Sequence, residues 1–285
     1  MLGLFCAMAW TAPALPAGFE VGQRWQYRHE GPRPGSVEPN AIDGERIVRV
    51  LSAGEGPEAT QWTIEERFTR DPRIVGRLYV GQDGLLAAIE IENEKGETAR
   101  LRYDPPAPYR PVEMKAGERR TIETTLRMDS ANFGLPSTTV IERLEDQTLT
   151  TPAGQFTDCL HYKSTSTSTV DIKIAKIPIT EERERWYHPA ANGMIKEVYR
   201  RGPFKFLGWS REGYTATSTL TAHGKEEVPP TSEVPAQPVA ESRDRAAPTP
   251  SQPKPSGPGR KAILLFTAVV ALAIGGILVR RARRT

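Results

Sequence analysis

The two residues that come closest to a catalytic pair are Cys159 and His161. They stand two positions apart in a segment that favours a strand, so their side chains should point to the same face. A thiolate–imidazole pair needs a third group that orients the imidazole, and the sequence identifies none. A cysteine in the middle of a strand is more often a small core residue. We therefore expect no catalytic residue and no enzymatic activity.

The remaining histidines and glycines give no sign of a metal or cofactor site. His29, His188 and His223 have no metal-ligand spacing with one another or with Cys159. No glycine-rich phosphate loop follows a strand and opens a helix, and no Gly-x-Ser-x-Gly elbow is present. We expect no metal ion and no cofactor.

Two pairs of adjacent carboxylates, Glu65-Glu66 and Glu181-Glu182, stand among arginines. Neighbouring residues of a strand point to opposite faces, so the members of a pair cannot share a proton. The pattern predicts solvated faces with ion pairs between strands.

Aromatic residues are a better clue, because they are spread over many of the expected strands. Their main expected role is packing in the core and on the sheet faces. If the sheet curls, its concave face would also form an apolar groove for a lipid or an acyl chain. The candidate ligand-binding residues are Trp25, Tyr27, Trp62, Trp186 and Tyr187.

The elements that would position these residues alternate with a period of two. Segments 73–80, 85–93 and 97–104 are joined by glycine-containing turns, which predicts an antiparallel meander. The prolines from Pro105 onward are expected to break the sheet.

The second half of this region has the same pattern. Segments 138–151 and 155–177 are rich in strand formers, and Ser/Thr residues alternate along much of the second. The strand from 164 onward is expected to leave the core at one end, or to form an exposed ribbon that another chain or ligand covers. Asn192-Gly193 is a strong hairpin signal, and 202–222 supplies the last strands. An antiparallel sheet of this length must curl or split, so we expect an all-β domain over 18–224: a curved sheet, a half-barrel or two β layers.

The C-terminal region predicts a membrane anchor. Residues 262–279 contain no charge, and as a helix they would span about 27 Å, which suits one transmembrane helix in a lipid bilayer. A basic tail, 280–285, follows and should stay cytoplasmic. The chain's formal net charge of +3 owes much to basic residues at the two ends of this span, so it does not indicate a nucleic-acid partner. The membrane-orienting residues are Arg280, Arg281, Arg283 and Arg284.

The other end of the chain and the linker agree with export. Residues 1–17 resemble a secretory signal peptide, with cleavage after Ala14 or Ala17. Residues 225–261 hold nine of the chain's 25 prolines and no aromatic residue, which predicts a disordered tether. We read this tether as a passive spacer rather than a ligand for proline-binding domains. The domain would then lie outside the cytoplasm, in the periplasm or at the cell surface.

Three fragments also carry a resemblance: 21–28 (VGQRWQYR), 151–163 (TPAGQFTDCLHYK) and 186–200 (WYHPAANGMIKEVYR). They resemble bacterial exported β-sheet domains of unknown function, similar to half-barrel, lipoprotein-carrier-like envelope proteins. The resemblance implies a curved antiparallel sheet and an envelope location, and it carries over no catalytic residue. The tail is similar to bacterial sorting signals, although it lacks Leu-Pro-x-Thr-Gly.

Two functions follow as expectations. The first is a membrane-tethered, non-catalytic binding module for an apolar ligand or an envelope protein partner. The alternative is a structural or adhesive protein of the cell envelope, whose tail is a sorting signal.

Overall fold

The computed structural model describes residues 18–36, 40–54, 60–92, 98–128, 133–172, 175–206 and 209–226. The predicted signal peptide and nearly all of the predicted linker, the predicted transmembrane helix and the basic tail lie outside these ranges. No helix within them is long and apolar enough to cross a membrane.

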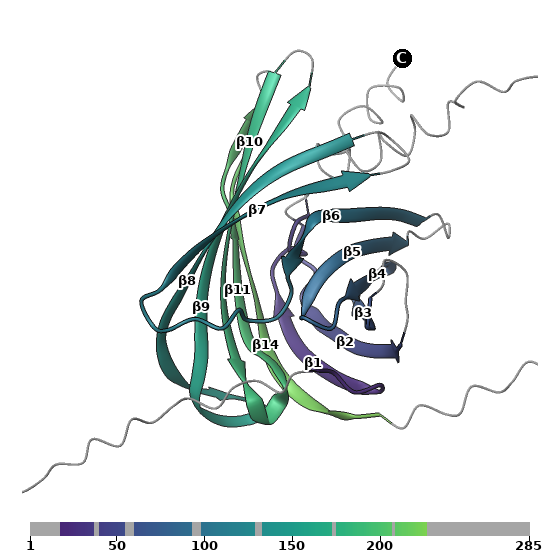
Figure 1. The fold of residues 1–285 in the computed structure, drawn as a ribbon, viewed down its shortest axis with the longest axis vertical. Coiled ribbons are helices and arrows are strands. Elements are labelled where there is room, and N and C mark those ends of the chain that lie inside the picture. The colour runs from purple at the N-terminus through teal and green to yellow at the C-terminus, as the bar shows by residue number, and fades with distance from the viewer. Residues whose placement is uncertain are drawn as a thin grey trace, which may run out of the picture.

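The described chain is all-β, as predicted, and its strands close into an antiparallel barrel (Figure 1). The first half of the barrel is formed by six strands: β1 (Gln23–Glu30), β2 (Gly44–Ala53), β3 (Trp62–Phe68), β4 (Asp71–Val80), β5 (Leu85–Glu92) and β6 (Thr98–Pro108). The predicted meander is β4–β5–β6. β6 runs on to Pro108, so the prediction that the sheet breaks from Pro105 was wrong.

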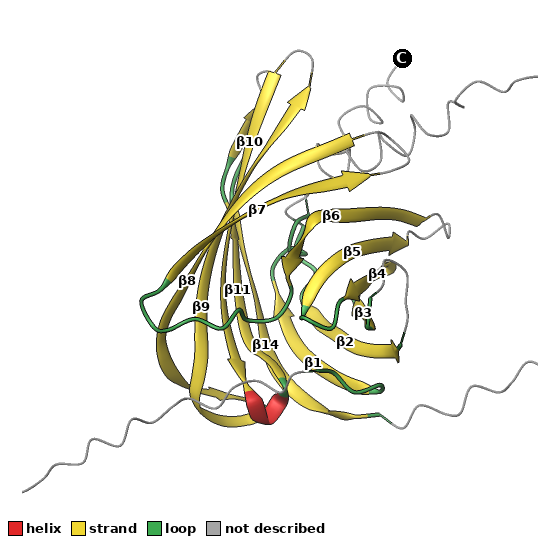
Figure 2. Cartoon of the chain, in the orientation of Figure 1, coloured by secondary structure: helices red, strands yellow, loops and turns green. Residues whose placement is uncertain are grey.

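The second half of the barrel holds longer strands. They are β7 (Arg119–Met128), β8 (Phe133–Thr151), β9 (Gly154–Ile172), β10 (Ala175–His188), β11 (Gly193–Arg201) and β14 (Tyr214–Lys225). A separate two-stranded sheet pairs β12 (Phe204–Phe206) with β13 (Trp209–Arg211). The single helical element of the described residues is the 3-10 turn Pro189–Ala191 (Figure 2).

Closure depends on β1, which pairs with β2 on one side and with β14 on the other. The barrel therefore replaces the open, curved sheet that the sequence left possible. Closure removes the unpaired backbone amides and carbonyls that a half-barrel would expose along two edges. The β6–β7 junction is short, because it pairs only Arg102–Asp104 with Thr125–Arg127.

Closure also decides which face of each strand is inside. Directly paired residues share a face. Tyr27 pairs with Arg46, and Arg46 pairs with Phe68, so these three side chains lie on the same face. The interior is apolar near one end, where Val50, Ile64, Val80, Ile195 and Leu220 are fully buried. The layer next to it carries charged and polar side chains. The barrel is therefore filled by two layers of different polarity.

The connection from β6 to β7, residues 109–118, crosses in front of the barrel between its two walls (Figures 1 and 2). Its start is fixed at Gly84, whose carbonyl accepts from the backbone amides of Tyr109 and Arg110 at 3.2 and 3.3 Å. Further along, the Tyr162 hydroxyl donates to the carbonyl of Val112 at 2.9 Å. This connection brings Tyr109 and Arg110 to the barrel interior.

Candidate functional site

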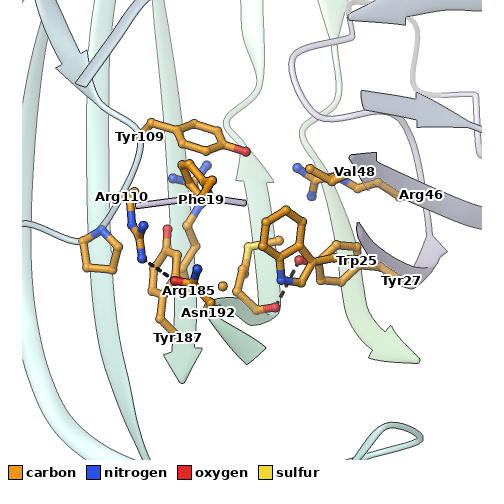
Figure 3. A pocket seen from close by; sticks show the side chains of 13 residues that line it. Phe19, Trp25, Tyr27, Arg46, Val48, Tyr109, Arg110, Arg185, Tyr187 and Asn192 are labelled. Carbon is orange, nitrogen blue, oxygen red and sulfur yellow. Dashed lines mark hydrogen bonds between the residues drawn. The ribbon is translucent and has the colours of Figure 1, made fainter. Parts of the chain in front are cut away.

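A small cavity of about 70 Å³, partly open to solvent, lies between the 109–118 connection and the barrel wall (Figure 3). Its lining is mainly aromatic and aliphatic, with three arginines. This combination of an apolar lining and a few polar groups is typical of small-molecule sites. The lining residues are Phe19, Trp25, Tyr27, Arg46, Val48, Tyr109, Arg110, Pro111, Arg185, Tyr187, Asn192, Gly193 and Met194.

Phe19, in the segment before β1, holds the aromatic lining together. Its ring makes edge contacts with Trp25 at 5.9 Å, Trp62 at 5.4 Å and Tyr109 at 6.1 Å between centroids. The Trp62 indole also donates to the Phe19 carbonyl at 3.1 Å. Edge-to-face contacts of this kind stabilise beyond the area they bury, so Phe19 joins β1, β3 and the 109–118 connection.

The polar atoms of Trp25 and Tyr27 are fixed by the hairpin between β10 and β11. The Trp25 indole donates to the carbonyl of Ala191 at 2.8 Å, and the Tyr27 hydroxyl donates to that of Met194 at 3.1 Å. A Cβ at Gly193 would lie 2.4 Å from the Trp25 indole nitrogen. The predicted Asn192-Gly193 turn is therefore also a packing requirement of the site.

A buried ion cluster lies on the more polar side of the cavity. The Glu197 carboxylate accepts from Arg46 at 2.6 Å and from Arg185 at 2.7 Å, and Arg183 lies 3.6 Å away. Arg46 also pairs with Glu66. Arg46 on β2 and Glu197 on β11 are joined over β1 and β14, which lie between them in the sheet, so the cluster ties together strands that do not pair directly.

The charges of this cluster stabilise one another. Burial disfavours the Glu197 carboxylate, but the guanidinium groups of Arg185 and Arg46 outweigh this and hold its pKa well below the ordinary value. Burial likewise opposes the charge of Arg46, yet Glu66 and Glu197 raise its pKa. Both groups remain ionised at neutral pH.

Arg110 is the contrasting arginine of the cavity. Its guanidinium donates to the Gly18 carbonyl at 3.1 Å and to the Asn192 side-chain oxygen at 2.7 Å, and it lies over the Phe19 ring at 4.6 Å. All of these partners are neutral. Among the described residues Arg110 forms no ion pair.

His29 lies beside the ion cluster in a neutral form. One ring nitrogen is 3.0 Å from the Ser218 hydroxyl and the other 3.3 Å from the Pro32 carbonyl. A neutral ring matches these partners, since one nitrogen donates to the carbonyl and the other accepts from the hydroxyl. Burial first, and then the charge of Arg46, lower the pKa of His29.

The five aromatic residues proposed from the sequence divide into two groups. Trp25, Tyr27 and Tyr187 line the cavity, whereas Trp62 is buried behind Phe19. Trp186 does not line the cavity: its ring stacks on His161 at 4.4 Å, and its indole donates to Gln147. The membrane-orienting arginines 280, 281, 283 and 284 lie outside the described residues.

Sequence reasoning missed most of the cavity lining. Phe19, Tyr109, Arg110 and Asn192 come from connections rather than strands, and alternation says nothing about connections. The arginine-rich β10 segment was read as part of a solvated face. The prediction of solvated carboxylates was wrong for Glu66, because closure turns it inward onto Arg46.

Its neighbour Glu65 is buried, and it pairs with Arg49 and Arg67 at 3.4 and 2.7 Å. The other predicted pair differs. Glu182 lies 2.9 Å from Lys163, and Glu181 lies 3.6 Å from Arg183, both with partly exposed side chains. The ion pairs between strands are therefore present, but solvation is not uniform.

Cys159 and His161 do not form the hydrogen-bonded pair that nucleophilic catalysis needs. The Cys159 thiol donates to the Phe156 carbonyl at 3.5 Å, and burial raises its pKa to about 11. His161 instead bonds the Glu184 carboxylate at 3.0 Å, which is an orienting group that the sequence did not reveal. The thiol is thus mainly protonated at neutral pH.

Within the described ranges, no three His, Cys, Asp or Glu side chains gather so that they could hold a metal ion. Comparisons with protein-family models, curated proteins and solved structures find no match to this chain.

Proposed function

We propose that the barrel is a non-catalytic binding module that holds a small, largely apolar ligand in the aromatic cavity. The observation that carries the proposal is the cavity itself, which is open in part to solvent and lined by Phe19, Trp25, Tyr27, Tyr109 and Tyr187. Aromatic side chains with fixed polar ends offer apolar contact area at little cost in conformational entropy. The lining is held by the hydrogen bonds of Trp25 and Tyr27, so it is organised before a ligand enters.

We further propose that the barrel works outside the cytoplasm, in the periplasm or at the cell surface. Residues 1–17 would direct export, 225–261 would act as a tether, and 262–279 would anchor the chain with Arg280 and its neighbours inside. Protease added to spheroplasts, whose outer envelope is opened and whose cytoplasmic membrane is intact, should then release the barrel from the anchor. A barrel that is protected in spheroplasts but cleaved after their lysis would contradict this placement.

Ligand binding can be tested with the neutral fluorescent probe N-phenyl-1-naphthylamine and the full-length chain in nanodiscs, with empty nanodiscs as background. Met194→Trp places a larger side chain at the cavity lining and should weaken probe binding about tenfold or more. Val140→Trp is the matched control, because Val140 is 40% exposed on β8, and it does not line the cavity. Binding that is absent in the wild type, or equal in all three proteins, would contradict a cavity ligand.

The same variants address the structural or adhesive role. That role is favoured by the Ser/Thr-rich parts of β8 and β9, whose side chains are exposed or partly exposed. If it dominates, Val140→Trp should disturb attachment to the envelope, and Met194→Trp should leave it unchanged.

A further inference from the structure

The cavity contains an arginine whose charge nothing in the described chain neutralises. Arg46 and Arg185 share the cavity with Arg110, but their charges are matched by Glu66 and Glu197. Within the part of the chain that the structure describes, the Arg110 guanidinium donates hydrogen bonds only to the Gly18 carbonyl and the Asn192 amide oxygen. The cavity therefore carries one surplus positive charge beside its aromatic lining.

The electrostatic surroundings of Arg110 also indicate that its charge lacks a counter-ion among the described residues. Burial lowers the pKa of its guanidinium, and the two groups that act in the opposite direction are Tyr187 and Tyr109. A phenol is neutral at neutral pH, so neither tyrosine compensates the charge. Burial of a cation without a counter-ion is costly, and an anion in the cavity would remove that cost.

The guanidinium is also held in a fixed position. Asn192 has a left-handed backbone, and its side-chain amide donates to the Gly18 carbonyl at 2.9 Å while its oxygen accepts from Arg110 at 2.7 Å. Together with the Phe19 ring, these contacts orient Arg110 from three sides. Two of its five N–H groups are used, so three remain for a ligand.

Two further hydroxyl groups stand at the cavity, those of Tyr109 and Tyr187. Neither forms a hydrogen bond with the described residues. In Figure 3 the Tyr187 side chain points toward the side of the cavity where Arg110 lies. A planar carboxylate can accept from a guanidinium fork and from a phenol at the same time.

We propose that the ligand of this cavity is an amphipathic carboxylic acid, whose carboxylate binds Arg110 and the Tyr187 hydroxyl while its apolar body contacts the aromatic lining. The inference rests on the proposed function, because it names the chemical class of the ligand for the same cavity. Arg110 would select for the acid group, and the aromatic residues would select for the body.

The test compares 1-naphthylacetate with its methyl ester, which has the same apolar body and no charge. Titration calorimetry on the full-length wild type should show the acid binding about tenfold more tightly than the ester, the scale expected of one charge-assisted hydrogen-bonded pair. Arg110→Gln should remove this preference, so that the acid and the ester bind this variant with affinities within about twofold of each other. Tyr187→Phe should reduce acid binding by a smaller factor, about threefold.

Two more variants keep the result interpretable. Arg119→Gln is the matched control. The Arg119 side chain is 68% exposed on β7, and it pairs with the charged Glu142 rather than with neutral groups. Arg110→Lys retains the positive charge, so it should keep part of the preference for the acid. It thereby distinguishes loss of charge from a folding defect in Arg110→Gln. Thermal unfolding of each variant shows that the barrel is intact.

The outcomes separate the two proposals. If the ester and N-phenyl-1-naphthylamine bind but the acid has no advantage, or keeps its advantage in Arg110→Gln, the carboxylate proposal is overturned and the binding module stands. If none of the three compounds binds, the proposed function itself fails.

Discussion

The cavity and the outer parts of β8, β9 and β10 are built from the same kind of alternating strand, yet they differ in burial. We call residues 137–140, 163–168 and 178–182 the arm; it extends past the shorter strands in Figure 1. Every side chain of the arm is exposed or partly exposed. Around the cavity, by contrast, Trp25, Tyr27, Ile195 and Glu197 are buried.

The difference teaches that burial comes from what lies opposite a strand rather than from the strand itself. Thr139 and Ser166 of the arm bond each other at 2.8 Å and remain partly exposed. Near the cavity, the same sheet faces Phe19 and the 109–118 connection, so even charged side chains are enclosed. Both faces of the sheet are therefore accessible to solvent in the arm, whereas the inner face of the barrel is enclosed.

The largest expected effect comes from removing charge inside the barrel. Glu197→Gln would leave Arg46 and Arg185 without their shared carboxylate, and we expect a loss of about 3–5 kcal/mol in the free energy of unfolding. Glu142→Gln is the matched change beside the arm, where the partner Arg119 is exposed, and it should cost less than about 1 kcal/mol. Urea unfolding followed by tryptophan fluorescence measures both free energies. Equal losses would contradict the expectation that the buried ion pairs stabilise the barrel more than the exposed one.

A smaller effect is expected from pH. Because the folded-state pKa of His29 is lowered from 6.5, the unfolded chain binds a proton more readily than the folded chain. The contribution of His29 to stability is therefore complete above about pH 6.5 and is lost as the pH falls below that value. His161, whose pKa burial also lowers, should act in the same direction.

Urea midpoints measured from pH 8 to pH 5 test this expectation. The wild type should lose stability over this range, and His29→Gln should lose less of it. His223→Gln is the control, since His223 is exposed. An unchanged pH profile in His29→Gln would show that the buried imidazole does not govern the acid sensitivity of the barrel.

Much of the fold was predictable because its signals are local. Alternation over 73–80, 85–93 and 97–104 and the glycines between these segments predicted β4, β5 and β6 within a few residues. Asn192-Gly193 predicted the hairpin before β11. The strands β2, β3 and β7 were not assigned, since their mixture of arginine, glutamate and apolar residues gives weak alternation.

The candidate site was only partly predictable. Trp25, Tyr27 and Tyr187 were proposed because aromatic residues on a curled sheet suggest a groove, and they do line the cavity. Trp62 and Trp186 were chosen by the same rule and lie elsewhere. Composition cannot tell which aromatic side chains face a cavity, because that depends on register and on the irregular pairing at Trp186 and Tyr187.

The amino-acid sequence by itself determined the all-β class and the positions of many strands and turns, because side-chain alternation and turn chemistry act over a few residues. Only the tertiary structure decided that β1 joins β14, that Glu197 and Arg46 meet, and that Arg110 reaches Gly18 and Asn192. These contacts join residues 82 to 202 positions apart in the chain, and no local sequence pattern specifies which strands pair at such separations.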